Sequence, residues 1–521
     1  MEQLTDLLKQ GHKNLSVLEI GSHIKNRQEK ILQFGEGNFL RAFVDMFIDE
    51  LNREGLFDGS VVVVPPIAQT TGSVDVINAQ NGCYTVVLRG LENNIPIVRQ
   101  QFVTSISRAV NMFRDFNLYM DTMKNPHLRY IVSNTTEAGI VFLETDKPEE
   151  NPTEPPLNFP AKITALLYER YKQFNGAADK GFIFIPCELI DNNGSKLKEF
   201  VLRHAKNWEL PEGFINWVQT CNHFTNTLVD RIVTGYPKDE AEEFAEMLGY
   251  RDELLVTGEI FHFFAIEAGE KAAKEINETL PFQKAGLNVV LTDDTTPYKL
   301  RKVRILNGAH TMSVLAAFLS GKNTVGEMME DSLFVEFLRK GIYNEIIPSL
   351  LLPPVEHSGL NENDLLSFAD SVYDRFANPY IKHYLLSIAL NSVSKFTARV
   401  LPSILDYYKK TGSFPQTLTL SLAALLAFYK GTAINDNTLT GSRTEGEYPI
   451  ADNLDILEFF KEQWQKNDVE QLVKTTMAKT DFWGMDLTLL PGFCQIVTDH
   501  LQGILANGIR SEVEMVIGVK S

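Results

Sequence analysis

Cysteine is scarce in this chain: only Cys83, Cys187, Cys221 and Cys494 occur among 521 residues. None forms a Cys-x-x-Cys pair, and the ten histidines form no His-x-x-x-His or mixed Cys/His cluster with ligand spacing. The pattern supports neither a disulfide scaffold nor a zinc site. We therefore expect four free thiols in a reducing cytoplasm, and no metal site.

An excess of basic residues is also lacking, because 49 Lys and Arg stand against 67 Asp and Glu, for a net charge of −18. A protein that binds nucleic acid needs cations to replace the counterions of the phosphate backbone. The sequence contains no basic run and has the opposite overall sign. It therefore argues against a nucleic-acid partner.

Long apolar runs are missing as well. The most apolar stretch, Leu420 to Tyr429, is ten residues long, whereas a membrane span needs roughly 20. The first twenty residues contain no apolar signal core. We expect no membrane association, a cytoplasmic location and a buried helix near residue 420.

Strand and helix patterns alternate in the first half of the chain. Short β-rich runs are predicted at 30–34, 61–64, 84–89, 101–106, 130–133 and 181–186. Helical spacing covers 38–52 and 110–123, and the proline-rich, acidic stretch 147–160 is predicted to be a surface loop. This alternation predicts an α/β domain over about residues 1–290, with a doubly wound, mainly parallel sheet.

The pattern of apolar residues changes after Leu291, where helical periodicity replaces the strand patterns. Helices are predicted at 298–319, 331–351, 362–376, 379–400, 415–430, 453–465 and 467–478. The polar, glycine-bearing stretch 431–448 is interpreted as an exposed loop. We expect a mostly α-helical C-terminal domain over residues 291–521.

A glycine-rich turn follows the first predicted strand. Gly35 and Gly37 are followed by Asn38, Phe39 and Arg41 at the start of the first predicted helix. Glycines there allow the backbone to approach a pyrophosphate, and the helix start offers unpaired N–H groups. A structural glycine turn is the alternative, since Leu40 replaces the third glycine of the usual pattern.

The type of dinucleotide is left open by the second strand, which ends in Pro65-Pro66. Neither an acid for a ribose hydroxyl nor an arginine for a 2′-phosphate follows it. Ser133, Asn134 and Thr135 follow a later strand, at the sheet end where a cofactor binds, and are further cofactor candidates.

A polar constellation opens the helical half of the chain. Lys302, Asn307 and His310 share a broad wedge of an α-helix, since at 100° per residue Asn307 lies about 140° and His310 about 80° from Lys302. A desolvated lysine can accept a hydroxyl proton, an amide can stabilise an oxyanion, and a histidine can orient a substrate oxygen. A solvated lysine, a helix cap and a core histidine are the alternative interpretation.

Three motifs carry a resemblance to a known family. The spacing Lys-x4-Asn-x2-His in residues 302–310 is similar to the catalytic motif of the polyol-specific long-chain dehydrogenases, the mannitol dehydrogenase family. Residues 224–232 (FTNTLVDRI) resemble its F-x4-V-D-R-I signature, and residues 35–42 resemble its cofactor turn. The likeness runs over about residues 28 to 505.

The resemblance implies an NAD-dependent oxidoreductase with a Rossmann-like N-terminal domain and catalytic residues Lys302, Asn307 and His310. The stretches VSNTTEAGI and NPYIKHYLLSIALN look most like the branch of the family that interconverts D-altronate and D-tagaturonate. A mannonate/fructuronate or mannitol-type enzyme and a non-catalytic NAD-binding sensor remain alternatives. The expected partner is a small sugar acid, with the protein a monomer or small homo-oligomer.

Substrate-binding candidates follow from departures from the family pattern and from the placement of cations. Glu188-Leu189 stands where polyol-oxidising members carry Asp-Asn, so Asn193 is a possible substitute. Lys299 stands where those members carry a glutamate, which would suit a carboxylate-bearing substrate. The remaining candidates are Asp230, which could instead form a structural ion pair with Arg231, and Arg375, Lys382 and His383.

Overall fold

The computed structural model describes residues 1–521 except 11–26, 71, 137, 148–152, 353–359 and 519–521. Its contacts divide the chain into two compact units. Unit 1 comprises Met1–Gly90 and Pro96–Thr295, and unit 2 comprises Leu91–Ile95 and Thr296–Ser521. The main boundary lies a few residues beyond the predicted one, while the grouping of Leu91–Ile95 with unit 2 was not predicted.

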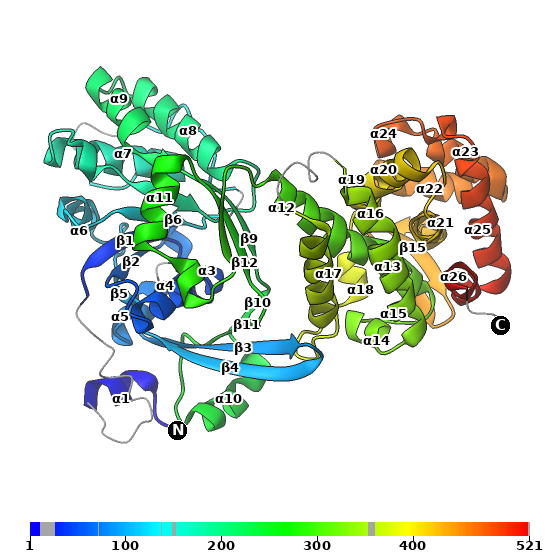
Figure 1. Cartoon of the computed structure of the whole chain (residues 1–521), viewed down its shortest axis with the longest axis horizontal. Helices are drawn as coiled ribbons and strands as arrows, with labels where there is room; N and C mark the ends of the chain where they lie inside the picture. Colours follow the sequence, from blue (N-terminus) through cyan, green and yellow to red (C-terminus); the bar gives the residue numbers. More distant parts are fainter. Residues whose placement is uncertain (11–26, 71, 137, 148–152, 353–359, 519–521) are drawn as a thin grey trace. The chain divides into compact units, whose positions relative to one another are not determined.

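A six-stranded sheet with every neighbouring pair parallel forms the centre of unit 1 (Figure 1). Its strands in spatial order are β5 (Ile106–Ala109), β2 (Ser60–Val64), β1 (Glu29–Phe34), β6 (Tyr130–Ser133), β7 (Ile183–Pro186) and β8 (His223–Phe224). The prediction of a mainly parallel sheet is confirmed. Strand β1 lies inside the sheet, so its carboxyl end is flanked by those of β2 and β6.

Successive residues of the central strands face two different apolar clusters. Ile31 packs with α4 (Val44–Arg53) and α11 (Glu270–Thr279), whereas Leu32 packs with α7 (Phe159–Gln173) and α8 (Asn193–Asn207). Strand β2 alternates in the same way, with Val61 and Val63 in the first cluster and Val62 and Val64 in the second. Both faces of the sheet are covered, as a doubly wound fold requires.

The remaining elements of unit 1 surround this sheet. Two smaller sheets have the strand orders β10 (Val233–Gly235), β11 (Val256–Glu259), β3 (Tyr84–Glu92), β4 (Ile95–Val103) and β13 (Val289–Thr292), β12 (Phe263–Glu267), β9 (Asn226–Asp230). The other helices are α1 (Leu4–Gln10), α3 (Asn38–Arg41), α5 (Gly72–Ala79), α6 (Phe116–Asp121), α9 (Glu212–Cys221) and α10 (Ala241–Leu248).

Several predicted boundaries in unit 1 were wrong. The single helix predicted over 38–52 is interrupted before α4, because Phe43 leaves helical geometry (φ −130°, ψ −91°) while its ring packs on Phe39, Phe47 and Phe264. The strand predicted over 101–106 belongs to two strands, and only the second half of 110–123 is helical. Part of the predicted loop 147–160 lies outside the described residues, and its end already belongs to α7.

Unit 2 is mostly helical, as predicted. Its helices are α12 (Thr296–Arg301), α13 (Gly308–Leu319), α14 (Val325–Met329), α15 (Ser332–Arg339), α16 (Ile347–Leu350), α17 (Glu362–Phe376), α18 (Leu385–Ile388), α19 (Ser392–Arg399), α20 (Leu401–Thr411), α21 (Gln416–Phe428), α22 (Leu454–Gln465), α23 (Val469–Met477), α24 (Thr480–Trp483), α25 (Phe493–Asn507) and α26 (Ile509–Ile517). Residues 417–428 of α21 are all buried, which confirms the buried apolar helix.

The exposed loop predicted at 431–448 was wrong. This stretch forms an antiparallel sheet of β14 (Gly431–Asn435), β15 (Thr438–Arg443) and β16 (Gly446–Ile450). Asp436 and Asn437 both have positive φ (46° and 60°), as a two-residue hairpin turn requires. Polar residues and glycines therefore marked hairpin turns and an exposed sheet face.

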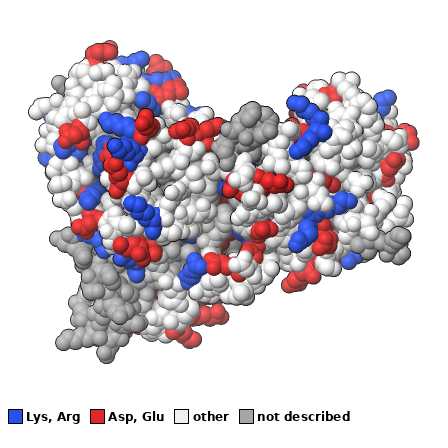
Figure 2. Space-filling model, viewed as in Figure 1, with Lys and Arg blue, Asp and Glu red and all other residues white. Residues whose placement is uncertain are grey.

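Surface and thiol chemistry agree with the composition. Acidic and basic side chains are interspersed over the face shown in Figure 2. All four cysteines are free thiols. Within the described part of the chain, every helix is too short or too polar to cross a bilayer.

Candidate active site

The turn after β1 requires glycine at its first position. Gly35 has φ +126°, and a Cβ there would lie 3.0 Å from both the Asn134 carbonyl oxygen and Leu40 Cδ1. The Gly35 N–H donates to the Val64 carbonyl at 3.0 Å, and the Asn134 N–H donates to the Phe34 carbonyl at 2.9 Å. The turn is thus held between the ends of β2 and β6, where only glycine avoids both strain and a clash.

Gly37 differs from Gly35, because it has ordinary φ and ψ (−67° and 165°). No atom lies within 4 Å of the position that a Cβ would take, and Gly37 and Asn38 are exposed. The backbone at Gly37 therefore faces open space beside the carboxyl end of β1. This combination, a tight turn followed by an uncovered backbone, fits the close approach of a pyrophosphate.

Arg41 braces this turn from inside. Its buried guanidinium donates from Nε to the Glu36 carbonyl at 3.2 Å, from Nη2 to Asn38 Oδ1 at 2.7 Å, and from Nη1 to the Leu254 carbonyl. Burial lowers its pKa. The prediction that Arg41 contacts the cofactor is therefore revised: Arg41 positions Asn38 and the turn.

The end of β6 is organised by a residue that sequence reasoning noted only as a departure. The buried carboxylate of Glu188 accepts from Ser133 Oγ (3.1 Å), Thr135 N–H (3.0 Å) and Thr135 Oγ1 (3.1 Å). Burial raises the pKa of Glu188, against these hydrogen bonds. The polar groups of Ser133 and Thr135 are thus used in hydrogen bonds to Glu188. Asn134 donates to the Cys187 carbonyl at 3.3 Å and stays partly exposed.

Asn193 has a structural role instead of the predicted substrate contact. It is fully buried, and its Nδ2 donates toward Pro186, Glu188 and Thr227 while its Oδ1 accepts the N–H of Thr227 and of Gly194 at 2.9 Å each. Its amide is saturated by the protein and joins β7, β9 and α8. We correct the prediction accordingly and leave Asn193 out of the substrate site.

Asp230 ends strand β9 and Arg231 follows it, both in buried positions. The guanidinium of Arg231 donates to the carbonyls of Ala42 (2.6 Å), Phe261 (3.1 Å) and Ile260 (3.2 Å), and burial lowers its pKa to about 9. Arg231 therefore ties the segment between α3 and α4 to the loop before β12. Asp230 stays a candidate at the strand end.

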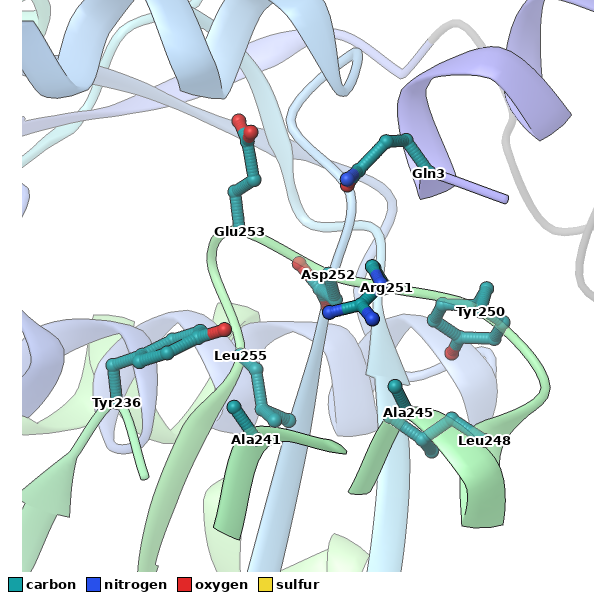
Figure 3. Close-up of a pocket in the computed structure, with 10 residues that line it drawn as sticks. All are labelled: Gln3, Tyr236, Ala241, Ala245, Leu248, Tyr250, Arg251, Asp252, Glu253 and Leu255. Carbon is teal, nitrogen blue, oxygen red and sulfur yellow. The ribbon is translucent and has the colours of Figure 1, made fainter. Parts of the chain in front are cut away.

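A separate hollow in unit 1 contains none of the predicted site residues. Figure 3 shows its lining, which includes Tyr236, Tyr250, Arg251 and Glu253. Arg251 is already paired with Glu242. We assign this hollow no role in the chemistry.

In unit 2 the catalytic candidates lie on a turn of π-helix, not on regular α-helix as predicted. Residues Lys302–Asn307 form the π-turn between α12 and α13. Because a π-turn bonds residues five apart, Asn307 lies about one turn beyond Lys302, and the angle between them around the helix is smaller than the predicted 140°. His310 follows three residues later in α13, about 60° around the helix from Asn307. All three residues are half-buried, whereas Arg304, Ile305 and Leu306 of the same segment are buried.

The opposite side of the π-turn is anchored in the helical core. Arg304 is buried and donates to Ser403 Oγ (2.6 Å), Ser349 Oγ (3.1 Å) and Asp406 Oδ2 (2.9 Å). These contacts join the π-turn to α16 and α20. The unusual helix geometry is therefore fixed by packing around it, consistent with the frequent use of π-turns at functional sites.

His310 is enclosed by aromatic rings and cations. Its ring stacks on Phe376 at a centroid distance of 4.0 Å and meets His383 edge-on at 5.3 Å. Burial lowers the pKa of His310 well below its usual value, and the electrostatic influence of His383, Arg375, Arg399 and Lys395 lowers it further. His310 is therefore neutral, and its buried Nε2 has no hydrogen-bond partner among the described residues.

The remaining predicted substrate residues divide into two groups. Arg375 and His383 join the surroundings of His310. Lys382 is exposed, and its Nζ lies 5.4 Å from the centre of the Tyr384 ring. Lys299 is partly exposed on α12, one turn before Lys302.

Comparison with known proteins gives matches along nearly the whole chain. Residues 29–278 match the family model "Mannitol dehydrogenase Rossmann domain", and residues 294–505 match "Mannitol dehydrogenase C-terminal domain". A protein of Yersinia enterocolitica named altronate oxidoreductase is 44% identical over 94% of this chain and 97% of its own length. Proteins of that name from Shigella flexneri and Escherichia coli K12 are each 45% identical over 93% of this chain and 96% of their own.

Solved structures share the fold at lower identity. A D-sorbitol dehydrogenase matches with a TM-score of 0.74 at 20% identity, covering 94% of this chain and 96% of that chain. Pseudomonas fluorescens mannitol 2-dehydrogenase matches with a TM-score of 0.62 at 21% identity, over 95% of this chain and 96% of its own.

Proposed function

We propose, since the chain belongs to the mannitol dehydrogenase family, that it is an NAD-dependent oxidoreductase that interconverts D-altronate and D-tagaturonate. The substrate assignment is supported by the relatives named altronate oxidoreductase, which are 44–45% identical over nearly their whole length. The chemistry rests on one structural observation, the π-turn that aligns Lys302 with Asn307 beside His310.

Unit 1 would hold the dinucleotide at the turn after β1. The uncovered backbone at Gly37 and the tight turn at Gly35 fit a pyrophosphate, while Asn38 and Asn134 are the accessible polar side chains nearby. When bound, NAD supplies the acceptor for the hydride. No acid or arginine follows β2 directly, so the preference for NAD rests on the family.

Unit 2 would supply the proton chemistry. As the C–H bond of the substrate carbinol breaks and its electron pair leaves as hydride, the Nζ of Lys302 accepts the hydroxyl proton, and the C–O bond becomes a carbonyl. The amide of Asn307 donates to the oxygen as negative charge develops on it. His310, held neutral, orients the same oxygen through its unpartnered Nε2. Reduction of the keto acid reverses each transfer.

The first test is NADH-dependent reduction of D-tagaturonate, followed at the nicotinamide absorbance with EDTA present. D-Fructuronate and D-fructose are run beside it, and Lys302→Met is the control for the base. We expect rapid turnover with D-tagaturonate alone, unaffected by EDTA and lost in the variant. Turnover only with D-fructuronate or D-fructose would transfer the assignment to another branch of the family. NADH binding without any turnover would favour a sensor.

We also infer that the protein works in the cytoplasm as a monomer or small homo-oligomer. Four free thiols suit a reducing compartment. Light scattering on the purified protein measures the oligomeric state directly, and fractionation of the source cells tests the location.

A further inference from the structure

Two cations of unit 2 that the proposed chemistry does not use lie beside the catalytic histidine. Lys395 and Arg399 are four residues apart on α19, so they share one face of that helix. Helix α19 packs against both the π-turn and α13. Arg399 brackets His310: its carbonyl oxygen lies 3.3 Å from where a Cβ of Gly308 would be, and its Nη1 donates to Thr311 Oγ1 at 3.4 Å.

These two cations lack the neighbouring carboxylate that normally pairs with a buried cation. Lys395 Nζ donates to the Ile388 carbonyl at 2.8 Å, and the described part of the chain places no carboxylate within ion-pair distance of Lys395 or Arg399. Asp452 is the acid that acts on Lys395, but its carboxylate is already engaged by the Tyr429 hydroxyl and the Asn453 N–H. Arg304, in the same helical core, has Asp406 at 2.9 Å.

Leaving like charges together in a half-buried place costs stability, because burial and mutual repulsion both act against them. Burial lowers the pKa of Lys395 and of Arg399, and Arg399 lowers that of Lys395 further. Arg375 adds a third positive charge from α17 to the surroundings of His310. A bound anion would relieve this repulsion, and a planar carboxylate matches the donors of a guanidinium.

We propose that Lys395 and Arg399, with Arg375, form the receptor for the carboxylate of the sugar-acid substrate, and so decide for an acid over a neutral sugar. The inference rests on the proposed function for the identity of the acid. The cations hold the charged end of the substrate, which places its carbinol at His310 and Lys302. A neutral ketose of similar size makes no use of the receptor.

The test compares three variants with the wild-type protein: Lys395→Met, Arg399→Gln and the conservative Arg399→Lys. Lys409→Met, which removes an exposed lysine from the neighbouring helix α20, is the matched control. Loss of one charge-assisted hydrogen bond should raise the KM for D-tagaturonate roughly 10- to 100-fold with a much smaller change in kcat. Arg399→Lys should recover part of the loss. NADH affinity should stay at the wild-type level, because the receptor is proposed to bind the substrate and not the dinucleotide.

A second measurement separates this inference from the proposed function. D-Altronate should raise the melting temperature of the wild-type protein with NADH, and Arg399→Gln should lose that shift, while its melting temperature without ligand stays equal or rises. If the wild-type protein turns over D-tagaturonate and the variants keep its KM, the receptor is wrong and the function stands. If the wild-type protein shows no turnover, the altronate-induced shift decides: its absence, or its survival in Arg399→Gln, overturns the receptor.

Discussion

The cations near the turn after β1 in unit 1 and the cations around His310 in unit 2 differ in how the protein pairs them. Around the turn, the guanidiniums of Arg41 and Arg231 and the amide of Asn193 are occupied by carbonyls and N–H groups of the protein. Around His310, a ring nitrogen has no partner among the described residues, and Lys395 and Arg399 have no carboxylate within ion-pair distance in that part of the chain. Polar groups that are already paired within the protein stabilise the scaffold. Polar groups without such a partner are the ones that a bound ligand can pair with.

The largest expected effect on this comparison is the loss of kcat in Lys302→Ala. Loss of a general base should lower kcat about 10³-fold, because the hydroxyl proton then has no acceptor on the protein. NADH binding, measured by fluorescence titration, should be unchanged. Lys409→Ala serves as the control. A kcat within about fivefold of the wild-type value would assign Lys302 a binding role only.

Asn193→Ala tests the scaffold side of the comparison. The substitution strands two buried N–H groups and several carbonyls, and should lower the free energy of unfolding by about 2–3 kcal/mol. The midpoint of urea unfolding measures this loss. Asn307→Ala should do the reverse, keeping the midpoint and lowering kcat. A stable Asn193→Ala protein with low kcat would return Asn193 to the active site.

The two glycines of the turn sharpen the comparison within unit 1. Gly35→Ala meets positive φ and backbone at 3.0 Å, so it should destabilise the protein by about 1–3 kcal/mol. Gly37→Ala meets neither, and its melting temperature should equal that of the wild type. If a pyrophosphate approaches Gly37, the added methyl group raises the Kd for NADH in Gly37→Ala. An unchanged Kd there would move the cofactor away from this turn.

The smallest expected effect concerns the pH dependence of kcat, to which His310 should contribute no step near neutral pH. The pKa of His310 is lowered, so the neutral ring persists in the folded protein well below the ordinary value near 6.5. The charged form is favoured only after unfolding. His310 therefore lowers the free energy of unfolding as the pH falls below about 6.5, and it has no effect on that free energy at higher pH. The pH profile of kcat between 6 and 8 should therefore show no step from His310. A step near pH 6.5 that disappears in His310→Gln would show that the ring is not held neutral.

Much of unit 1 was predictable from local patterns. Runs such as Val61–Val64 are apolar on both faces because both faces of the sheet are covered, and this fixed β1, β2, β6 and β7. The interruption at Phe43 was not predictable, because it arises from the packing of Phe43 on Phe264, more than two hundred residues away. The hairpin at Asp436-Asn437 was missed because turn residues were interpreted as a loop.

The sequence by itself determined the α/β and helical halves and the position of Gly35, because these depend on periodicity and spacing along the chain. Its resemblance to the family marked Lys302, Asn307 and His310 as candidates. Tertiary structure decided what those residues can do. The π-turn aligns Lys302 with Asn307, and it is anchored through Arg304 to residues up to about a hundred positions away. The gathering of Arg375, Lys395 and Arg399 around His310 likewise depends on the packing of three helices. Charge and hydrogen bonding act through space, so only the folded chain shows which polar groups are saturated and which remain for a ligand.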